Sequence, residues 1–98
     1  MKRARVVVPW REGLHLRHAT ELVWVAQSFR ATISLKCGGK IADLRSVLSV
    51  IALCATMGTA LDLETRGEDE QDAAQAVQQV FSSRDSGDSF ESALQRRL

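Results

Sequence analysis

The chain has 98 residues, of which 45% are hydrophobic and 26% are charged, and its formal net charge at pH 7 is +1. This length is typical of one domain that can bury a single core. A net charge so close to zero argues against proteins that bind nucleic acid or membranes through a long-range field. The longest apolar run, residues 47–53, is interrupted by Ser49 and is far too short to span a membrane.

Two cysteines, Cys37 and Cys54, show neither Cys-x-x-Cys nor metal-ligand spacing. Their apolar surroundings predict buried free thiols in a reducing compartment. The apolar run after the basic N-terminus ends at Pro9, which makes it too short for the hydrophobic part of a signal peptide. The sequence therefore predicts a soluble, cytoplasmic protein without direct membrane insertion.

Residues 5–8 are a β-branched run ended by Pro9, which predicts a short first strand. Residues 16–29 predict a helix, because apolar side chains recur at the spacing of one buried face. That face comprises Ala19, Leu22, Val23, Ala26 and Phe29. Trp24 lies on a different face of the helix from this apolar stripe, so we do not expect it to pack in the core with these residues.

Residues 31–36 alternate between apolar and polar side chains and predict a half-buried strand. The inward positions of this strand are Ile33 and Leu35. The dipeptide at 38–39, Gly-Gly, indicates a hairpin turn. Residues 40–43, which include Ile41, then form a short return strand.

Residues 45–53 predict a short helix with Ser46 near its first turn. Residues 60–65 alternate again and predict a fourth strand with Leu61 and Leu63 inward.

The acidic residues at 68–70 indicate the start of a last helix, because negative charge is favoured in a first turn. The apolar face of this helix comprises Ala73, Ala76, Val77, Val80 and Phe81. We expect one domain over residues 1–83, followed at 84–98 by a polar linker and a short C-terminal helix that would be marginal in isolation.

The element order is thus strand, helix, strand, strand, helix, strand, helix. Few, mostly antiparallel strands with three helices predict an α+β fold of two layers, with the helices on one face of the sheet and the other face open.

The segment Gly-Leu-His-Leu-Arg at 13–17 places His15 just ahead of the first helix and Arg17 in its first turn. A first turn offers unpaired backbone N–H groups and the positive end of the helix dipole, which together favour an anion. A neutral imidazole beside such a seat is a nucleophile, and a guanidinium can grip the product phosphate. This favours reversible phosphoryl transfer through His15. The alternative is a helix-start histidine that only caps or packs.

Four motifs together resemble the HPr family, the histidine-containing phosphocarrier proteins of the bacterial phosphotransferase system. They are the segment at 13–17, the Arg-Ser-Val at 45–47, Gly58, and the Gly-Glu-Asp-Glu at 67–70. The resemblance extends from residue 6 to residue 81. It implies an open-faced sandwich of four antiparallel strands and three helices, which agrees with the element order.

The resemblance also implies a function. His15 would accept a phosphoryl group from enzyme I, itself charged by phosphoenolpyruvate, and pass it to a sugar-specific or regulatory acceptor protein. Arg17 would bind the phosphate. The relay needs neither a metal nor another cofactor, because the partner proteins supply the remaining transition-state charges. The alternative is an HPr-like regulatory adaptor, controlled at Ser46, without a relay through His15.

Ser46 corresponds to the position that a dedicated kinase, HPr kinase/phosphorylase, phosphorylates in some bacteria; the alternative is an ordinary N-terminal capping serine. The resemblance places a partner-binding surface beside His15, formed by Trp24, Arg45, Val47, Leu48 and Ile51. For Val47 and Leu48 a place in the core competes with this role. Balanced surface charge favours a monomer.

Three positions depart from the family pattern. Glu12 replaces a small polar residue and is expected to be solvated; if it faced the site, phospho-His15 would be less stable. His18 replaces a proline and is expected to be a surface residue rather than a second phosphoacceptor. Cys54 replaces a glycine and is expected to be a buried thiol rather than a redox switch.

Overall fold

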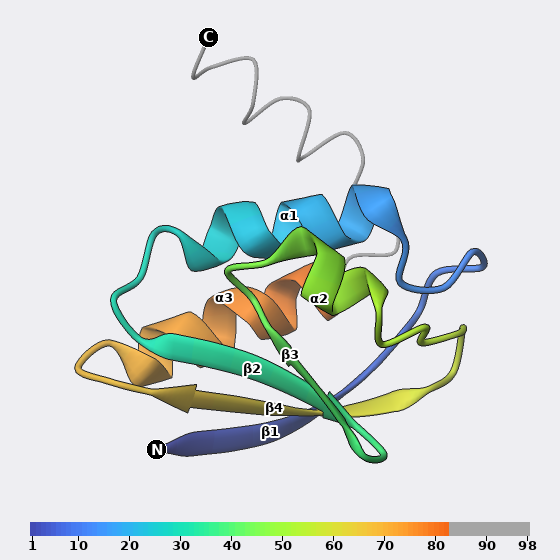
Figure 1. The fold of residues 1–98 in the computed structure, drawn as a ribbon. Coiled ribbons are helices and arrows are strands. Elements are labelled where there is room, and N and C mark those ends of the chain that lie inside the picture. Colours follow the sequence, from blue (N-terminus) through green and yellow to red (C-terminus); the bar gives the residue numbers. More distant parts are fainter. Residues whose placement is uncertain (83–98) are drawn as a thin grey trace, which may run out of the picture.

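Within residues 1–82, an antiparallel sheet of four strands carries three helices on one face, and its other face is open (Figure 1). The computed structural model describes residues 1–82, so the linker and helix expected at 84–98 lie outside the described residues. The elements follow the predicted order: β1 (Lys2–Val7), α1 (Leu16–Ala26), β2 (Thr32–Cys37), β3 (Lys40–Asp43), α2 (Val47–Ile51), β4 (Ala60–Arg66) and α3 (Glu70–Ser82). The α+β class and the two layers are confirmed.

The strand order in the sheet is β1-β4-β2-β3, with every neighbouring pair antiparallel. The expected inward side chains of β2 and β4 are all buried, namely Ile33, Leu35, Leu61 and Leu63. The first strand begins at Lys2 rather than at residue 5, because its pairing with β4 already starts at Lys2 and Thr65. Backbone pairing, which side-chain patterns do not report, set this boundary.

The core lies between the sheet and the helices. From α1 it receives Ala19, Leu22, Val23 and Ala26, and from α3 Ala73, Ala74, Val77, Val80 and Phe81. Burial of each large apolar side chain contributes roughly 1.5–3 kcal/mol, so these two faces hold the helices on the sheet. Ala76 is only half-buried, and Ala74 takes the place expected for it.

The first two helices end earlier than the apolar spacing predicted. The first helix ends at Ala26, because the N–H groups of Ser28 and Phe29 turn back onto carbonyls only three residues earlier. Phe29 still packs, half-buried, against the core. The second helix spans only Val47–Ile51.

The motif at 67–70 joins β4 to α3. The Asp69 carboxylate accepts the backbone N–H groups of Arg30 (2.9 Å) and Ala31 (2.8 Å), and these bonds hold its pKa below the usual range. Gly67 has φ +146°, and a Cβ there would lie 2.8 Å from the Ala31 Cα. Asp69 binds the backbone at residues 30–31, and Gly67 lets the chain approach the same segment closely. Both residues of the motif therefore serve this one contact.

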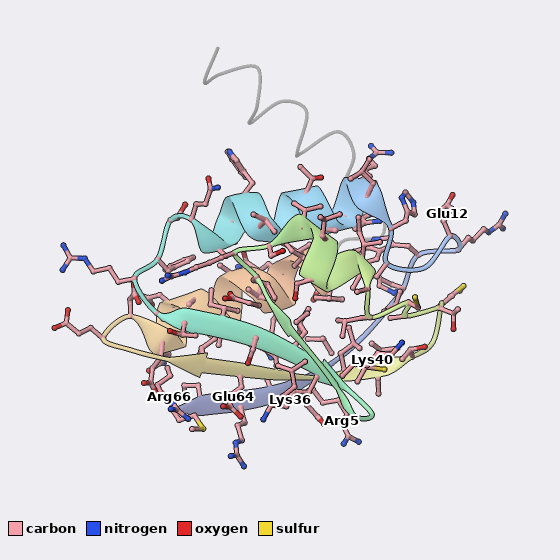
Figure 2. The ribbon with its side chains drawn as sticks, viewed as in Figure 1. Arg5, Glu12, Lys36, Lys40, Glu64 and Arg66 are labelled. Carbon is pink, nitrogen blue, oxygen red and sulfur yellow. The ribbon has the colours of Figure 1, made fainter. Side chains whose placement is uncertain are left out.

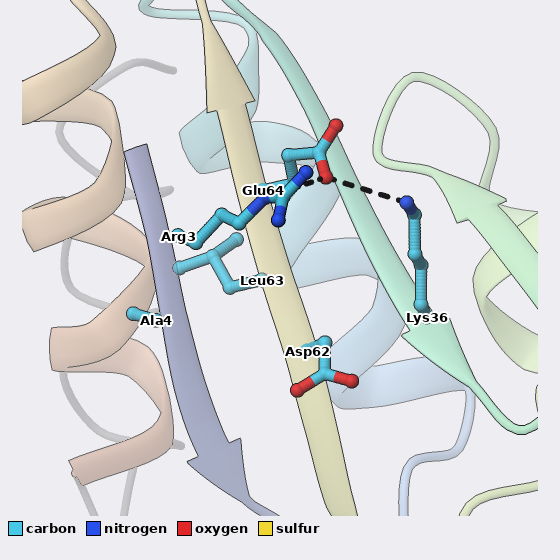
Figure 3. A pocket seen from close by; sticks show the side chains of 6 residues that line it. All are labelled: Arg3, Ala4, Lys36, Asp62, Leu63 and Glu64. Carbon is cyan, nitrogen blue, oxygen red and sulfur yellow. Dashed lines mark hydrogen bonds and ion pairs between the residues drawn. The ribbon is translucent and has the colours of Figure 1, made fainter. Parts of the chain in front are cut away.

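The open face of the sheet is polar, and Figure 2 shows Arg5, Lys36, Glu64 and Arg66 projecting from it. Glu64 Oε2 pairs with Lys36 Nζ (3.3 Å) and Arg3 Nε (3.4 Å) across neighbouring strands (Figure 3). The Glu64 side chain is only 16% exposed, so these cross-strand pairs satisfy a largely covered carboxylate on the open face of the sheet. Within the described residues, no helix is long and apolar enough to cross a membrane.

Candidate functional site

His15 occupies the N-cap position of α1 with an extended backbone (φ −116°, ψ −169°), and its side chain makes no capping hydrogen bond. Its carbonyl accepts the N–H of Ala19 (2.9 Å), so the residue starts the helix through its backbone alone. The imidazole is 43% exposed. The alternative, that the His15 side chain caps the helix, is therefore wrong. The imidazole contacts solvent and neighbouring side chains instead.

The loop before His15 is fixed against the segment that follows α2. Leu14 donates its N–H to the Ala55 carbonyl (2.8 Å), and Gly13 donates to the Trp10 carbonyl (2.9 Å). Gly13 has φ +77°, and a Cβ at this position would lie 2.6 Å from the same Ala55 oxygen. Only glycine fits this close approach, which sets the direction from which the chain enters α1.

Glu12 lies on the loop that precedes α1 (Figure 2), and its side chain is 69% exposed. Its solvation is as expected. The carboxylate nevertheless faces the site, because Glu12 Oε2 lies 3.9 Å from His15 Nε2.

His18 is buried, with only 5% of its surface exposed, so the prediction of a surface residue was wrong. Its ring stacks on Trp10 (centroids 3.7 Å apart, planes at 10°), and Trp10 in turn packs on Phe81 of α3. Burial, with added repulsion from His15 and Arg17, lowers the pKa of His18 to about 4. This ring is therefore neutral at pH 7.

The two histidine rings meet edge to face, with centroids 5.3 Å apart and planes at 68°. The Nδ1 atom of His18 is buried and has no hydrogen-bond partner within the described part of the chain. A ring so enclosed offers no open path to a second phosphoryl group. The buried ring of His18 forms one side of the site, and the ring of His15 packs against it.

Arg17 lies in the first turn of α1, where its side chain is exposed. Its charge is one cause of the lowered pKa of the neighbouring His18. The first turn also directs backbone N–H groups and the positive end of the helix dipole outward. This arrangement can hold an anion such as a phosphoryl group.

Ser46 caps α2, and its Oγ accepts the backbone N–H of Ser49 (3.2 Å). Ser49 Oγ in turn accepts the N–H of Asp43 (3.0 Å), so the start of this short helix is tied to β3. The capping interpretation of Ser46 is confirmed, while its phosphorylation stays a prediction. Arg45 lies outside the helix, with an exposed side chain.

We expect Ser46→Ala to lower the free energy of unfolding by about 1 kcal/mol, because the Ser49 N–H loses its cap. Urea titration followed by tryptophan fluorescence measures the loss. Ser28→Ala, at an exposed position beyond the end of α1, is the matched control and should change stability by less than about 0.5 kcal/mol. Equal losses in the two variants would contradict the cap.

The residues expected to bind partners differ in their exposure and in their position relative to His15. Leu48 is 79% exposed, so the competing core interpretation was wrong for it, whereas Val47 and Ile51 are half-buried against the core. Trp24 is half-buried on α1, nine residues after His15, or about 13 Å along the helix axis. The structure does not place Trp24 directly beside His15.

Two further exposed apolar residues were not singled out from the sequence. Leu16, directly after His15, is 62% exposed, and Met57 is 58% exposed. Helical spacing puts Leu16 in line with Ala19 and Val23, which would have suggested the core. It is nevertheless exposed at the first position of α1.

The two thiols are less buried than predicted. Cys54 is exposed and has φ +53°, because it lies in the turn that leaves α2. Cys37 is half-buried at the end of β2, next to the hairpin. Within residues 1–82, no group of three or more His, Cys, Asp or Glu side chains could hold a metal ion.

Comparison with known proteins identifies the family. The family model described as the PTS HPr component phosphorylation site matches residues 2–83. The chain belongs to the HPr family. The HPr phosphocarrier of Xylella fastidiosa is 32% identical over 79 residues, which cover 81% of this chain and 89% of the relative. That of Haemophilus influenzae is 40% identical over 63 residues, covering 64% and 74%.

Solved structures of the HPr family share the fold. The crystal structure of HPr-C-His from Thermoanaerobacter tengcongensis has a TM-score of 0.80 at 26% identity, covering 85% of this chain and 93% of that one. HPr from Bacillus anthracis has a TM-score of 0.77 at 28% identity, covering 82% and 95%. The family comprises phosphocarriers of the phosphotransferase system, which carry a group rather than catalyse a reaction on their own.

Proposed function

We propose that this protein accepts a phosphoryl group on His15 from phospho-enzyme I and passes it to a sugar-specific or regulatory acceptor protein. The observation that carries the proposal is the imidazole of His15, half-exposed and uncommitted to capping at the start of α1, with Arg17 in the same turn. A solvent-facing nucleophile beside an anion seat suits a group that must arrive and leave quickly.

The site favours modest rather than tight retention of the phosphate. The first-turn N–H groups and the Arg17 guanidinium supply attraction. The exposed Glu12 carboxylate supplies repulsion, and the described residues leave the His15 ring 43% exposed. A phosphoryl group held in this way keeps its transfer potential, and each partner protein would complete the transition-state charge.

The proposed docking surface combines exposed apolar side chains near the start of α1 with those of α2. Leu16 and Leu48 are its most exposed apolar members. Arg45, exposed just before α2, adds positive charge at its rim. Apolar contacts rimmed by arginine suit a partner whose own site is rimmed by acidic residues.

Phosphorylation of the protein by enzyme I, phosphoenolpyruvate and magnesium tests the proposal. We expect mass spectrometry at neutral to alkaline pH to detect one acid-labile phosphate on the wild type and none on His15→Ala.

Phosphoramidate, a small phosphoryl donor, provides a parallel reaction that needs no docking. Leu48→Asp should slow transfer from enzyme I about tenfold, as expected for a loss of roughly 1.4 kcal/mol of docking energy, and leave the phosphoramidate reaction unchanged.

A wild type that takes no phosphate from an active cognate enzyme I would overturn the relay. The adaptor function with control at Ser46 would then be the one to pursue, and incubation with a serine kinase and ATP would test it. If Leu48→Asp slowed transfer from enzyme I and from phosphoramidate equally, the substitution would be disturbing the His15 site itself and not the docking of enzyme I.

A further inference from the structure

His15 lies next to two residues that depart from the family pattern, Glu12 and His18. Glu12 Oε2 lies 3.9 Å from the Nε2 atom of the His15 ring. The edge-to-face contact with the His18 ring restricts the tilt of the His15 ring. The two ring nitrogens therefore have unlike surroundings, since a carboxylate approaches Nε2.

We propose that Glu12 is a positioning residue for His15: its carboxylate holds the proton on Nε2 and leaves the lone pair of Nδ1 to take the phosphoryl group. This inference deepens the proposed function and rests on it for the transfer step. The distance of 3.9 Å is longer than a hydrogen bond, but both side chains are partly exposed and a small rotation closes it. A carboxylate that fixes a histidine tautomer is a known device of nucleophilic sites.

The electron and proton balance of the step is simple. The Nδ1 lone pair forms the new N–P bond, and the donor's bond to phosphorus breaks with its electron pair returning to the donor. The ring becomes an imidazolium with its proton still on Nε2, paired with the Glu12 carboxylate. When the acceptor attacks phosphorus, the electron pair of the N–P bond returns to Nδ1 and restores the starting tautomer. No proton has to move in either direction.

The same geometry reconciles Glu12 with a negatively charged phosphoryl group. Nδ1 and Nε2 lie on different sides of the ring, so a carboxylate at Nε2 stands away from a phosphoryl group on Nδ1. The carboxylate nevertheless adds negative charge near the phosphoryl oxygens and repels them weakly. Glu12 would therefore speed release of the group, at the expense of its lifetime on the protein.

The other ionisable groups around the ring do not compete for this role. His18 faces His15 from the same helix but is neutral, because burial lowers its pKa to about 4. Arg17 is a cation and has no affinity for a ring proton. Among the residues described around the site, the carboxylate that approaches a ring nitrogen of His15 is that of Glu12.

The experiment compares wild type with Glu12→Gln, which removes the charge and keeps the shape of the side chain. Two-bond ¹⁵N–¹H spectra of the free protein at alkaline pH report the ratio of the two tautomers of His15. We expect Glu12→Gln to lower the ratio of Nε2–H to Nδ1–H roughly two- to fivefold, as befits an exposed pair. Release of phosphate from phospho-His15, made with phosphoramidate, should slow by a similar factor near pH 7, and the difference should shrink in 1 M salt.

Glu68→Gln is the matched control, because it makes the same charge change at an exposed position far along the chain. It should alter neither the tautomer ratio nor the release rate. An unchanged tautomer ratio in Glu12→Gln, or an equal change in Glu68→Gln, would overturn the proposal. If His15 took no phosphate from either donor, a shifted tautomer ratio would still support the pairing, and only the proposed function would fall.

Discussion

Gly13→Ala is expected to lower the free energy of unfolding by about 2–4 kcal/mol. Part of the loss, about 1–2 kcal/mol, is the penalty of a side chain at φ +77°. The rest arises because the new Cβ would lie 2.6 Å from the Ala55 carbonyl oxygen, so the backbone must move. That oxygen also accepts the N–H of Leu14, so the movement reaches the entry to α1 and His15. Thermal unfolding should shift down by roughly 10 °C or more.

Gly38→Ala is the control for this prediction. Gly38 also has a positive φ, of +60°, but a Cβ there would meet nothing within 4 Å. Its loss should be confined to the backbone penalty of about 1–2 kcal/mol. The phosphorylation rate of His15 should fall in Gly13→Ala and not in Gly38→Ala. Equal destabilisation in both variants would show that the contact with Ala55 relaxes without cost.

The stability of the protein should fall by about 2–3 kcal/mol between pH 6.5 and pH 4 through His18 alone. Its pKa is about 4 in the folded state and near 6.5 when unfolded, so in this window the unfolded chain binds the proton more readily. The contribution is complete above pH 6.5, is lost as the pH falls toward 4, and levels off below it. Protonation places a charge in a buried ring that is stacked on Trp10.

His18→Phe isolates this effect, because phenylalanine keeps an aromatic ring against Trp10 and does not titrate. Urea titrations of both proteins at several values between pH 4 and pH 7 give two stability curves. The curves should diverge as the pH falls, with the wild type losing more. Parallel curves would mean that His18 titrates as in the unfolded chain and that its burial is without electrostatic consequence.

The fold was largely predictable because its signals are local. The Gly-Gly turn fixed the hairpin, so the range 40–43 of β3 was predicted to the residue. The alternating residues of β4 and the apolar stripe of α3 gave the right faces, since strand and helix periods differ. Errors lie at the ends of elements, as in α1 beyond Ala26, where a turn of three residues replaces the helical bond.

The site was predictable in its chemistry but not in its surroundings. The order of residues 13–17 by itself determined that a histidine and an arginine share the start of a helix, because that follows from sequence spacing. Only the tertiary structure decided what stands around them. Trp10 comes from the loop after β1 and Phe81 from α3, and their stacking buries His18, a polar residue that no local pattern assigns to a core. Likewise the 3.9 Å approach of Glu12 to His15 depends on the path of a loop held at Ala55, forty residues further along the chain.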